Sequence, residues 1–138
     1  MPQTYHTPQQ AEDAFYDALE EGDPDKLLSV WAESDDVRCL LPMQPIVLGH
    51  KGVTDLFTKV LSGGRGVSLA IKHLGWIETD DIAIHHVEET IQTQASGAPP
   101  QAPLYGINIY RRLAGSWRLI VHMNSPTPPP SRDLDTPR

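Results

Sequence analysis

Acidic and basic side chains share one face of a predicted strand, residues 82–93. His86 and Glu88 are two residues apart, and side chains in a strand alternate between its faces, so both lie on the face that carries Ile84 and Thr90. An imidazole beside a carboxyl group can transfer protons near neutral pH, because histidine titrates there and burial raises the pKa of a glutamate. This strand therefore predicts a site for general acid–base chemistry.

A second set of polar side chains lies in the stretch from Leu104 to Pro126. Two runs rich in β-branched and aromatic residues flank Gly115, which predicts an antiparallel hairpin. With a bulge or a longer loop near Gly115, one face is apolar and consists of Ile107, Ile109, Trp117, Leu119, Val121 and Met123. The other face is mixed, as the wall of a small-molecule pocket is, and consists of Asn108, Tyr110, Ile120, His122 and Asn124.

Composition indicates one soluble globular domain. A chain of 138 residues can bury a core, and 21% charged residues are typical of such proteins. The N-terminus lacks the features of a signal peptide, no apolar run is long enough to span a membrane, and Cys39 is the single cysteine, so we expect a cytoplasmic protein. The net charge of −7, with no basic cluster beyond Arg111-Arg112, argues against nucleic acid or a membrane as partner.

Helices precede strands along the chain. Thr7 and Pro8 predict the start of a helix that ends at Gly22, and Asp23-Pro24 predicts a short second helix. The remaining predicted segments are a strand at 37–41, a loop at 43–52, a helix that ends at 62–64, strands at 67–77 and 82–93, a flexible connection at 95–103, and the hairpin. This order predicts an α+β fold with helices packed on one face of a curved sheet. Residues 1–126 are predicted to form the domain, and the Pro-rich residues 127–138 a flexible tail.

Three stretches resemble the nuclear transport factor 2-like superfamily, and within it the SnoaL-like and ketosteroid-isomerase-like proteins. They are AFYDALEEGDPDKLLSVWAESDDV, the Gly49-x-x-Gly52-Val53 helix entry, and INIYRRLAGSWRLIVHMNSP. The resemblance covers roughly Thr7 to Pro126. It implies a cone in which a curved, mixed or antiparallel sheet wraps around about three N-terminal helices, a cystatin-like α+β roll, and leaves a deep pocket.

The resemblance also locates the groups that the isomerases use. The family's oxyanion-binding tyrosine falls at Phe15, its general-base aspartate at Cys39, and its hydrogen-bond-donating aspartate at Asn108. Phe15 has no hydroxyl, and an apolar pocket raises the pKa of a thiol. Asn108 can still donate a hydrogen bond to an oxyanion. We therefore expect no standard ketosteroid isomerase activity.

The resemblance turns the face of His86 and Glu88 into the pocket. The catalytic set that it implies is His86, Glu88, Asn108 and His122. The implied ligand-binding set is Phe15, Trp31, Cys39, Phe57, Thr90, Tyr110, Ile120 and Asn124. We expect neither a metal ion nor a cofactor.

Simpler interpretations of the same residues stay open. One alternative is that His86 and Glu88 form only a satisfied polar pair in a solvated cavity. His85 and His86 point to opposite faces, so they suit a shared metal ion poorly, and His86, Glu88 and His122 match no ligand-spacing motif. The alternative for Cys39 and for Trp31 is that each is an ordinary core residue.

The sequence thus predicts a protein that binds a small apolar or mixed-polarity molecule and catalyses an isomerisation, cyclisation or dehydration by proton transfer. The alternative is a non-catalytic ligand-binding or dimerisation module. We expect a homodimer through the convex side of the sheet, because the apolar hairpin face would otherwise meet water. Ala83, Val87 and Ile91 are predicted to extend that face.

Overall fold

The computed structural model describes residues 3–64, 66–92 and 102–128. Most of the predicted connection at 95–103 and the predicted tail from residue 129 onward lie outside these ranges. In the described part of the chain, no helix has the length and apolar character that a membrane span requires.

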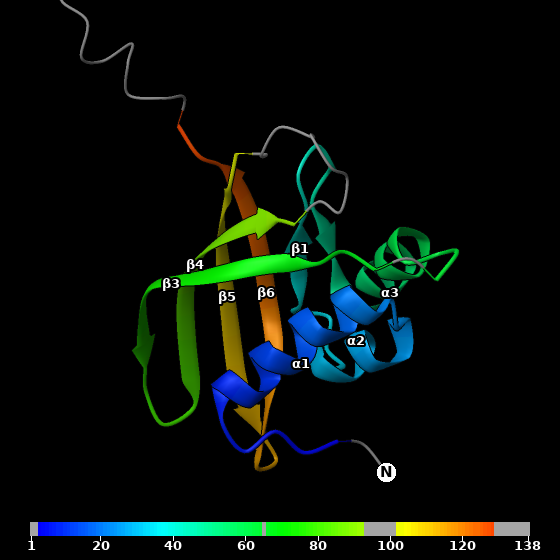
Figure 1. Ribbon diagram of the computed structural model, residues 1–138. Coiled ribbons are helices and arrows are strands. Elements are labelled where there is room, and N and C mark those ends of the chain that lie inside the picture. Colours follow the sequence, from blue (N-terminus) through cyan, green and yellow to red (C-terminus); the bar gives the residue numbers. More distant parts are fainter. Residues whose placement is uncertain (1–2, 65, 93–101, 129–138) are drawn as a thin grey trace, which may run out of the picture.

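Three helices and six strands form the α+β fold that the sequence predicts (Figure 1). The helices are α1 (Pro8–Glu21), α2 (Pro24–Val30) and α3 (Gly49–Val60). The strands are β1 (Arg38–Leu40), β2 (Val47–Leu48), β3 (Leu69–Glu78), β4 (Ile82–Ile91), β5 (Leu104–Leu113) and β6 (Ser116–Pro126). The short strand β2 lies within the predicted loop, where it pairs with β1.

The capping residues at the start of the chain act as predicted. The Thr7 side chain accepts a hydrogen bond from the Gln10 backbone at 3.1 Å, and Gly22 ends α1 in the left-handed conformation with φ 69°. Asp23 caps α2 through the Lys26 backbone at 3.1 Å. The two helices therefore follow each other across one short break.

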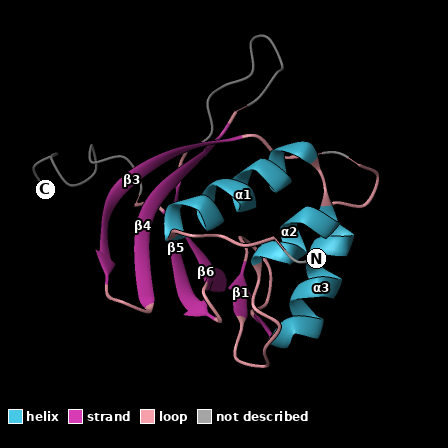
Figure 2. Cartoon of the chain, turned by 90° about the horizontal axis from the view of Figure 1, so that it is seen from below, coloured by secondary structure: helices cyan, strands magenta, loops and turns pink. Residues whose placement is uncertain are grey.

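All six strands belong to one sheet in the order β2-β1-β6-β5-β4-β3. The pairing of β1 with β6 is parallel, and the other pairings are antiparallel. The sheet curves so that the three helices lie on one side of it (Figure 2). The hydrophobic core lies between the helices and this inner side and includes Phe15, Trp31 and Phe57.

The hairpin contains a bulge, but at a different place from the one predicted. Leu113 pairs with Ser116 across a tight turn, and the register shifts farther along, where Ile109 pairs with Val121 and Tyr110 with Leu119. Because Ile120 is the extra residue, Leu119 lies on the inner side together with Tyr110.

The predicted convex face is therefore wrong in part. Trp117 and Leu119 are buried in the core, at 4% and 0% exposure. The burial pattern of β4 also places Ala83 and Val87 inside, and Ile91 lines a cavity between sheet and helices. The hairpin residues that do lie on the outer side are Ile107, Ile109, Val121 and Met123.

Candidate functional site

A continuous hydrogen-bonded network of polar side chains lies between α1 and the inner side of the sheet. Helix α1 carries two of its members, and strands β3 to β6 carry the others. They are Glu12, Tyr16, His73, His85, Glu89, Asn108, Tyr110, His122 and Asn124.

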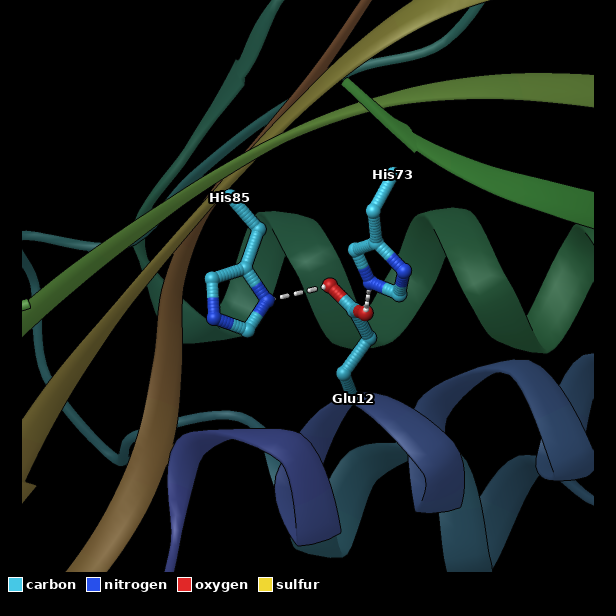
Figure 3. A group of neighbouring side chains, drawn as sticks. All are labelled: Glu12, His73 and His85. Atoms are coloured by element: carbon cyan, nitrogen blue, oxygen red, sulfur yellow. Dashed lines mark hydrogen bonds and ion pairs between the residues drawn. The ribbon is translucent and has the colours of Figure 1, made fainter. Parts of the chain in front are cut away.

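Glu12 is the centre of one half of this network (Figure 3). Its side chain is only 1% exposed, and its Oε2 accepts hydrogen bonds from His85 Nδ1 at 2.8 Å, Tyr110 OH at 3.1 Å and Asn108 Nδ2 at 3.3 Å. His73 Nε2 contacts the other oxygen, Oε1. Burial acts to raise the pKa of the Glu12 carboxyl, but hydrogen bonds from His85 and His73 outweigh it and lower the pKa to about 2. Glu12 is therefore an anion at neutral pH.

Glu89 is the centre of the other half. Tyr16 OH donates to Glu89 Oε2 at 2.7 Å, and Asn124 Nδ2 donates to Glu89 Oε1 at 2.9 Å. The Nε2 atom of His122 lies 3.8 Å from Glu89 Oε2. Burial and the nearby Glu89 charge raise the pKa of Tyr16 well above its usual value, so this phenol stays protonated and donates.

Asn108 joins the two halves and faces His122. Its Nδ2 donates to Tyr16 OH at 2.8 Å and to Glu12, which turns its Oδ1 toward His122 Nδ1 at 2.5 Å. The other ring nitrogen of His122 lies 3.1 Å from Asn124 Oδ1. Burial lowers the pKa of His122 and favours the neutral ring, while the Glu89 charge and the Asn124 hydrogen bond act in the opposite direction.

A small, mostly apolar cavity opens beside the Glu89 half. Its volume is about 150 Å³, which is room for one ring-sized molecule. Helices α1 and α3 form one wall, and strands β3 to β6 form the other. The three polar residues in its lining are Glu89, His122 and Asn124, and among the apolar ones are Phe15, Leu19, Leu41, Phe57, Leu69 and Leu104.

The prediction of which face of β4 turns inward is wrong, because the inward residues are shifted by one position along the strand. His86 is exposed and pairs with Ile107 on the outer side of the sheet, and Glu88 and Thr90 share that outer side. His85 and Glu89 face inward instead, at 2% and 3% exposure. The doublets His85-His86 and Glu88-Glu89 give each face one imidazole and one carboxylate, and a one-residue slip exchanges the faces.

The other predicted site residues lie inside, although in different surroundings. Phe15, Phe57, His122 and Asn124 line the cavity. Asn108 and Tyr110 belong to the network. The remaining predicted ligand-binding residues, which are core residues outside the cavity lining, are Trp31, Cys39 and Ile120. Burial, with a smaller contribution from Glu89, raises the pKa of the Cys39 thiol to about 12, so it stays protonated at neutral pH.

Five members of the network were absent from the predicted site: Glu12, Tyr16, His73, His85 and Glu89. The sequence does carry one signal for Glu12, because it lies three and seven residues before Phe15 and Leu19, on the apolar face of α1. A carboxylate in such a stripe needs buried partners, which points to basic or hydroxyl groups on the sheet. No comparable signal distinguishes His85 from His86.

Comparison with known proteins supports the recognition made from the sequence. A family model described as a SnoaL-like domain matches residues 9–129. A protein from Thiobacillus denitrificans ATCC 25259, named as a candidate calcium/calmodulin-dependent protein kinase type II association domain, is 31% identical over 91% of this chain and 99% of its own, with a TM-score of 0.83. No curated protein sequence matches the chain.

Two further solved structures share the fold. A candidate dehydratase of the NTF2-like family from Streptomyces avermitilis is 25% identical over 88% of this chain and 94% of its own, with a TM-score of 0.75. A ketosteroid isomerase-like protein from Erwinia carotovora atroseptica SCRI1043 is 21% identical over 88% and 94% of the two chains, with a TM-score of 0.66. The second of these is a likeness of fold alone.

Proposed function

We propose that this chain, which belongs to the SnoaL-like domain family, binds a small, largely apolar molecule in the cavity beside Glu89 and catalyses proton transfer on it. Isomerisation, cyclisation and dehydration all depend on such a step. The observation that carries this proposal is a buried carboxylate and a buried, neutral imidazole at the polar end of an otherwise apolar cavity.

Glu89 is the residue we assign as proton acceptor. Tyr16, Asn124 and His122 surround it, but its carboxylate also lines the cavity, where a ligand can contact it. The mostly apolar cavity limits the access of water, so a proton taken from the ligand is held by Glu89 or passed into the network, where it can exchange with solvent before one is returned. His122 can receive that proton, because an imidazolium at this position would donate to both Asn108 Oδ1 and Asn124 Oδ1.

Cyclohexanone in D2O tests this assignment, since one six-membered ring matches the cavity volume. The ketone's α-proton would pass to Glu89, and the enolate formed would take up deuterium, which NMR detects. We expect the wild-type chain to accelerate this exchange and Glu89→Gln to reduce it by roughly 10²–10⁴-fold. The matched control is Glu88→Gln, a change on the outer face of the same strand, which should leave exchange unchanged.

Binding and turnover can be separated in the same experiment. The ketone's effect on the thermal unfolding temperature reports binding, and deuterium uptake reports chemistry. If the ketone stabilises the chain but its α-protons exchange no faster than in buffer, the catalytic proposal is wrong and the chain is a ligand-binding module. Equal exchange by Glu89→Gln and wild type would remove Glu89 from it.

A second candidate function is assembly through the outer side of the sheet. The Thiobacillus denitrificans relative carries the name of an association domain. On this chain, one row of aliphatic residues crosses four strands on the outer side, because Ile77 pairs with Ile84, Ile84 with Ile109, and Ile109 with Val121. Ile77 is 59% exposed and Ile107, in the adjacent row, is 37% exposed. We propose that a second copy of the chain covers this face.

A further inference from the structure

We propose that Glu12, His73 and His85 form a binding site for a divalent first-row transition-metal ion of the Zn²⁺ class. The three side chains come from α1, β3 and β4 and point toward one another (Figure 3). Each offers one ligand atom, and these atoms all lie within 4.8 Å of one another. This site is separate from the Glu89 cavity and does not depend on the proposed function.

The ligand types favour this class of ion. Two imidazoles and one carboxylate suit Zn²⁺, Co²⁺ or Ni²⁺, whereas Mg²⁺ and Ca²⁺ prefer sites made of oxygen atoms. Bonds of about 2.0–2.1 Å in a tetrahedral arrangement place ligand atoms about 3.3 Å apart. Glu12 Oε2 and His85 Nδ1 are already 2.8 Å apart, so they need to separate only slightly to admit an ion.

Two of the ligands are held in place by their surroundings. The side chains of Glu12 and His85 are 1% and 2% exposed, and Glu12 Oε2 is further oriented by donors from Tyr110 and Asn108. Hydrogen bonds of this kind to a metal-binding carboxylate fix its direction. The His73 side chain is 30% exposed, so the third ligand lies at the solvent side and leaves a route by which the ion can enter.

The cleft beside His73 carries negative charge. It has a volume of about 310 Å³, and its lining includes the carboxylates Glu12, Asp13, Asp17 and Glu20. Neither lysine nor arginine is among the residues that line this cleft in the described ranges. Such a field raises the local concentration of cations at the entrance to the site.

Binding requires each of the two rings to turn a nitrogen lone pair toward the ion. His85 Nδ1 and His73 Nε2 now contact the Glu12 carboxylate as donors, and each must present a lone pair to an ion instead. A neutral imidazole can do this by carrying its proton on the other ring nitrogen. The ion then takes the place of these two protons beside the Glu12 charge.

Trp76 provides a direct reporter of the site. Its ring centroid lies 5.4 Å from that of His73 and 5.2 Å from that of His85. A paramagnetic ion between the two imidazoles should therefore quench the fluorescence of Trp76. The test uses the untagged full chain after treatment with a chelator, titrated with Zn²⁺ by calorimetry and with Co²⁺ by absorption and fluorescence.

We expect one equivalent of Zn²⁺ to bind and to raise the unfolding temperature, and Co²⁺ to give visible absorption bands and quenched fluorescence. Mg²⁺ should have none of these effects. Trp76→Phe should remove most of the quenching and leave Zn²⁺ affinity within about threefold, since this residue supplies no ligand atom.

Single-ligand variants complete the test. His73→Gln and His85→Gln should each weaken Zn²⁺ binding by more than about tenfold. His86→Gln, on the outer face of β4, is the matched control and should bind as the wild type does. Should His85→Gln fail to fold, the partly exposed His73→Gln decides alone. The proposal would be overturned if the wild type bound Zn²⁺ no more tightly than His73→Gln does. It would also be overturned if His86→Gln lost as much Zn²⁺ affinity as the ligand variants.

Discussion

His122 is the residue at which burial and hydrogen bonding act in opposite directions. Its ring packs 5.0 Å from that of Phe15, between the side-chain oxygens of Asn108 and Asn124. Loss of hydration favours the neutral ring, and the nearby Glu89 carboxylate favours the charged one. The hydrogen bond with Asn124 and the Glu12 carboxylate also favour the charged ring, with smaller effects. The net result is a lowered pKa.

This lowered pKa predicts how stability depends on pH. Because the folded chain holds His122 neutral, the unfolded chain binds more protons, and stability is lost as the pH falls below the ordinary value of 6.5. Each unit of pKa difference is worth about 1.4 kcal/mol. Urea unfolding between pH 5 and pH 8 should show a steeper decline for the wild type than for His122→Gln.

His86→Gln is the control for that measurement, because this histidine is exposed on the outer face. The stability of the His86→Gln variant should change with pH as that of the wild type does. A His122→Gln variant as sensitive to acid as the wild type would mean that another group accounts for the decline.

At the scale of elements, the β5–β6 hairpin determines which side chains reach the interior. Its turn consists of Ala114 and Gly115, both with positive φ, at 50° and 80°. Such a two-residue turn favours Asn-Gly, because an alanine is strained in the left-handed region. The bulge at Ile120 then shifts the register, so that His122 lies on the inner side as Leu119 does.

Ala114→Asn should therefore stabilise the chain. We expect the free energy of unfolding in urea to rise by about 0.5–1 kcal/mol, since asparagine tolerates this backbone conformation. Ala114→Val is the matched opposite, because a β-branched side chain is poorly accommodated at positive φ, and it should lower stability. The same direction of change in both variants would contradict this account of the turn.

For the molecule as a whole, the helices cover one side of the sheet and leave the outer side uncovered. All three helices lie on the inner side (Figure 2), and in the described ranges the outer side keeps an aliphatic surface made of Ile77, Ile84, Ile107, Ile109, Val121 and Met123. Contiguous apolar surface of this kind usually marks an interface. A stable pair of subunits buries about 800 Å² on each partner.

Ile107→Lys should disrupt a dimer formed through this surface. We expect sedimentation at micromolar concentration to show a dimer for the wild type and a monomer for the variant, because a charge placed at the centre of an isologous contact meets its own copy. Lys72→Ala, at the polar end of the same outer side, should leave the dimer intact. A monomeric wild type would exclude this assembly.

The local structure at the start of the chain and the family could both be predicted from the sequence. Thr7, Gly22 and Asp23 define the first two helices through interactions that span a few residues, so their effect can be read without the fold. The order of helices and strands, with the hairpin motif, was enough for the α+β fold and for the SnoaL-like resemblance.

Which face of β4 turns inward depends on contacts that form only in the folded chain. His85 and Glu89 turn inward because Glu12 and Tyr16 of α1, each 73 residues away in the sequence, satisfy them there. His86 and Glu88 offer the same chemical groups to the other face, so no local pattern could choose between the two registers. The position of the bulge in β6 also depends on tertiary packing. Leu119 rather than Ile120 packs beside Tyr110, and the shape of the core determines which of the two fits there.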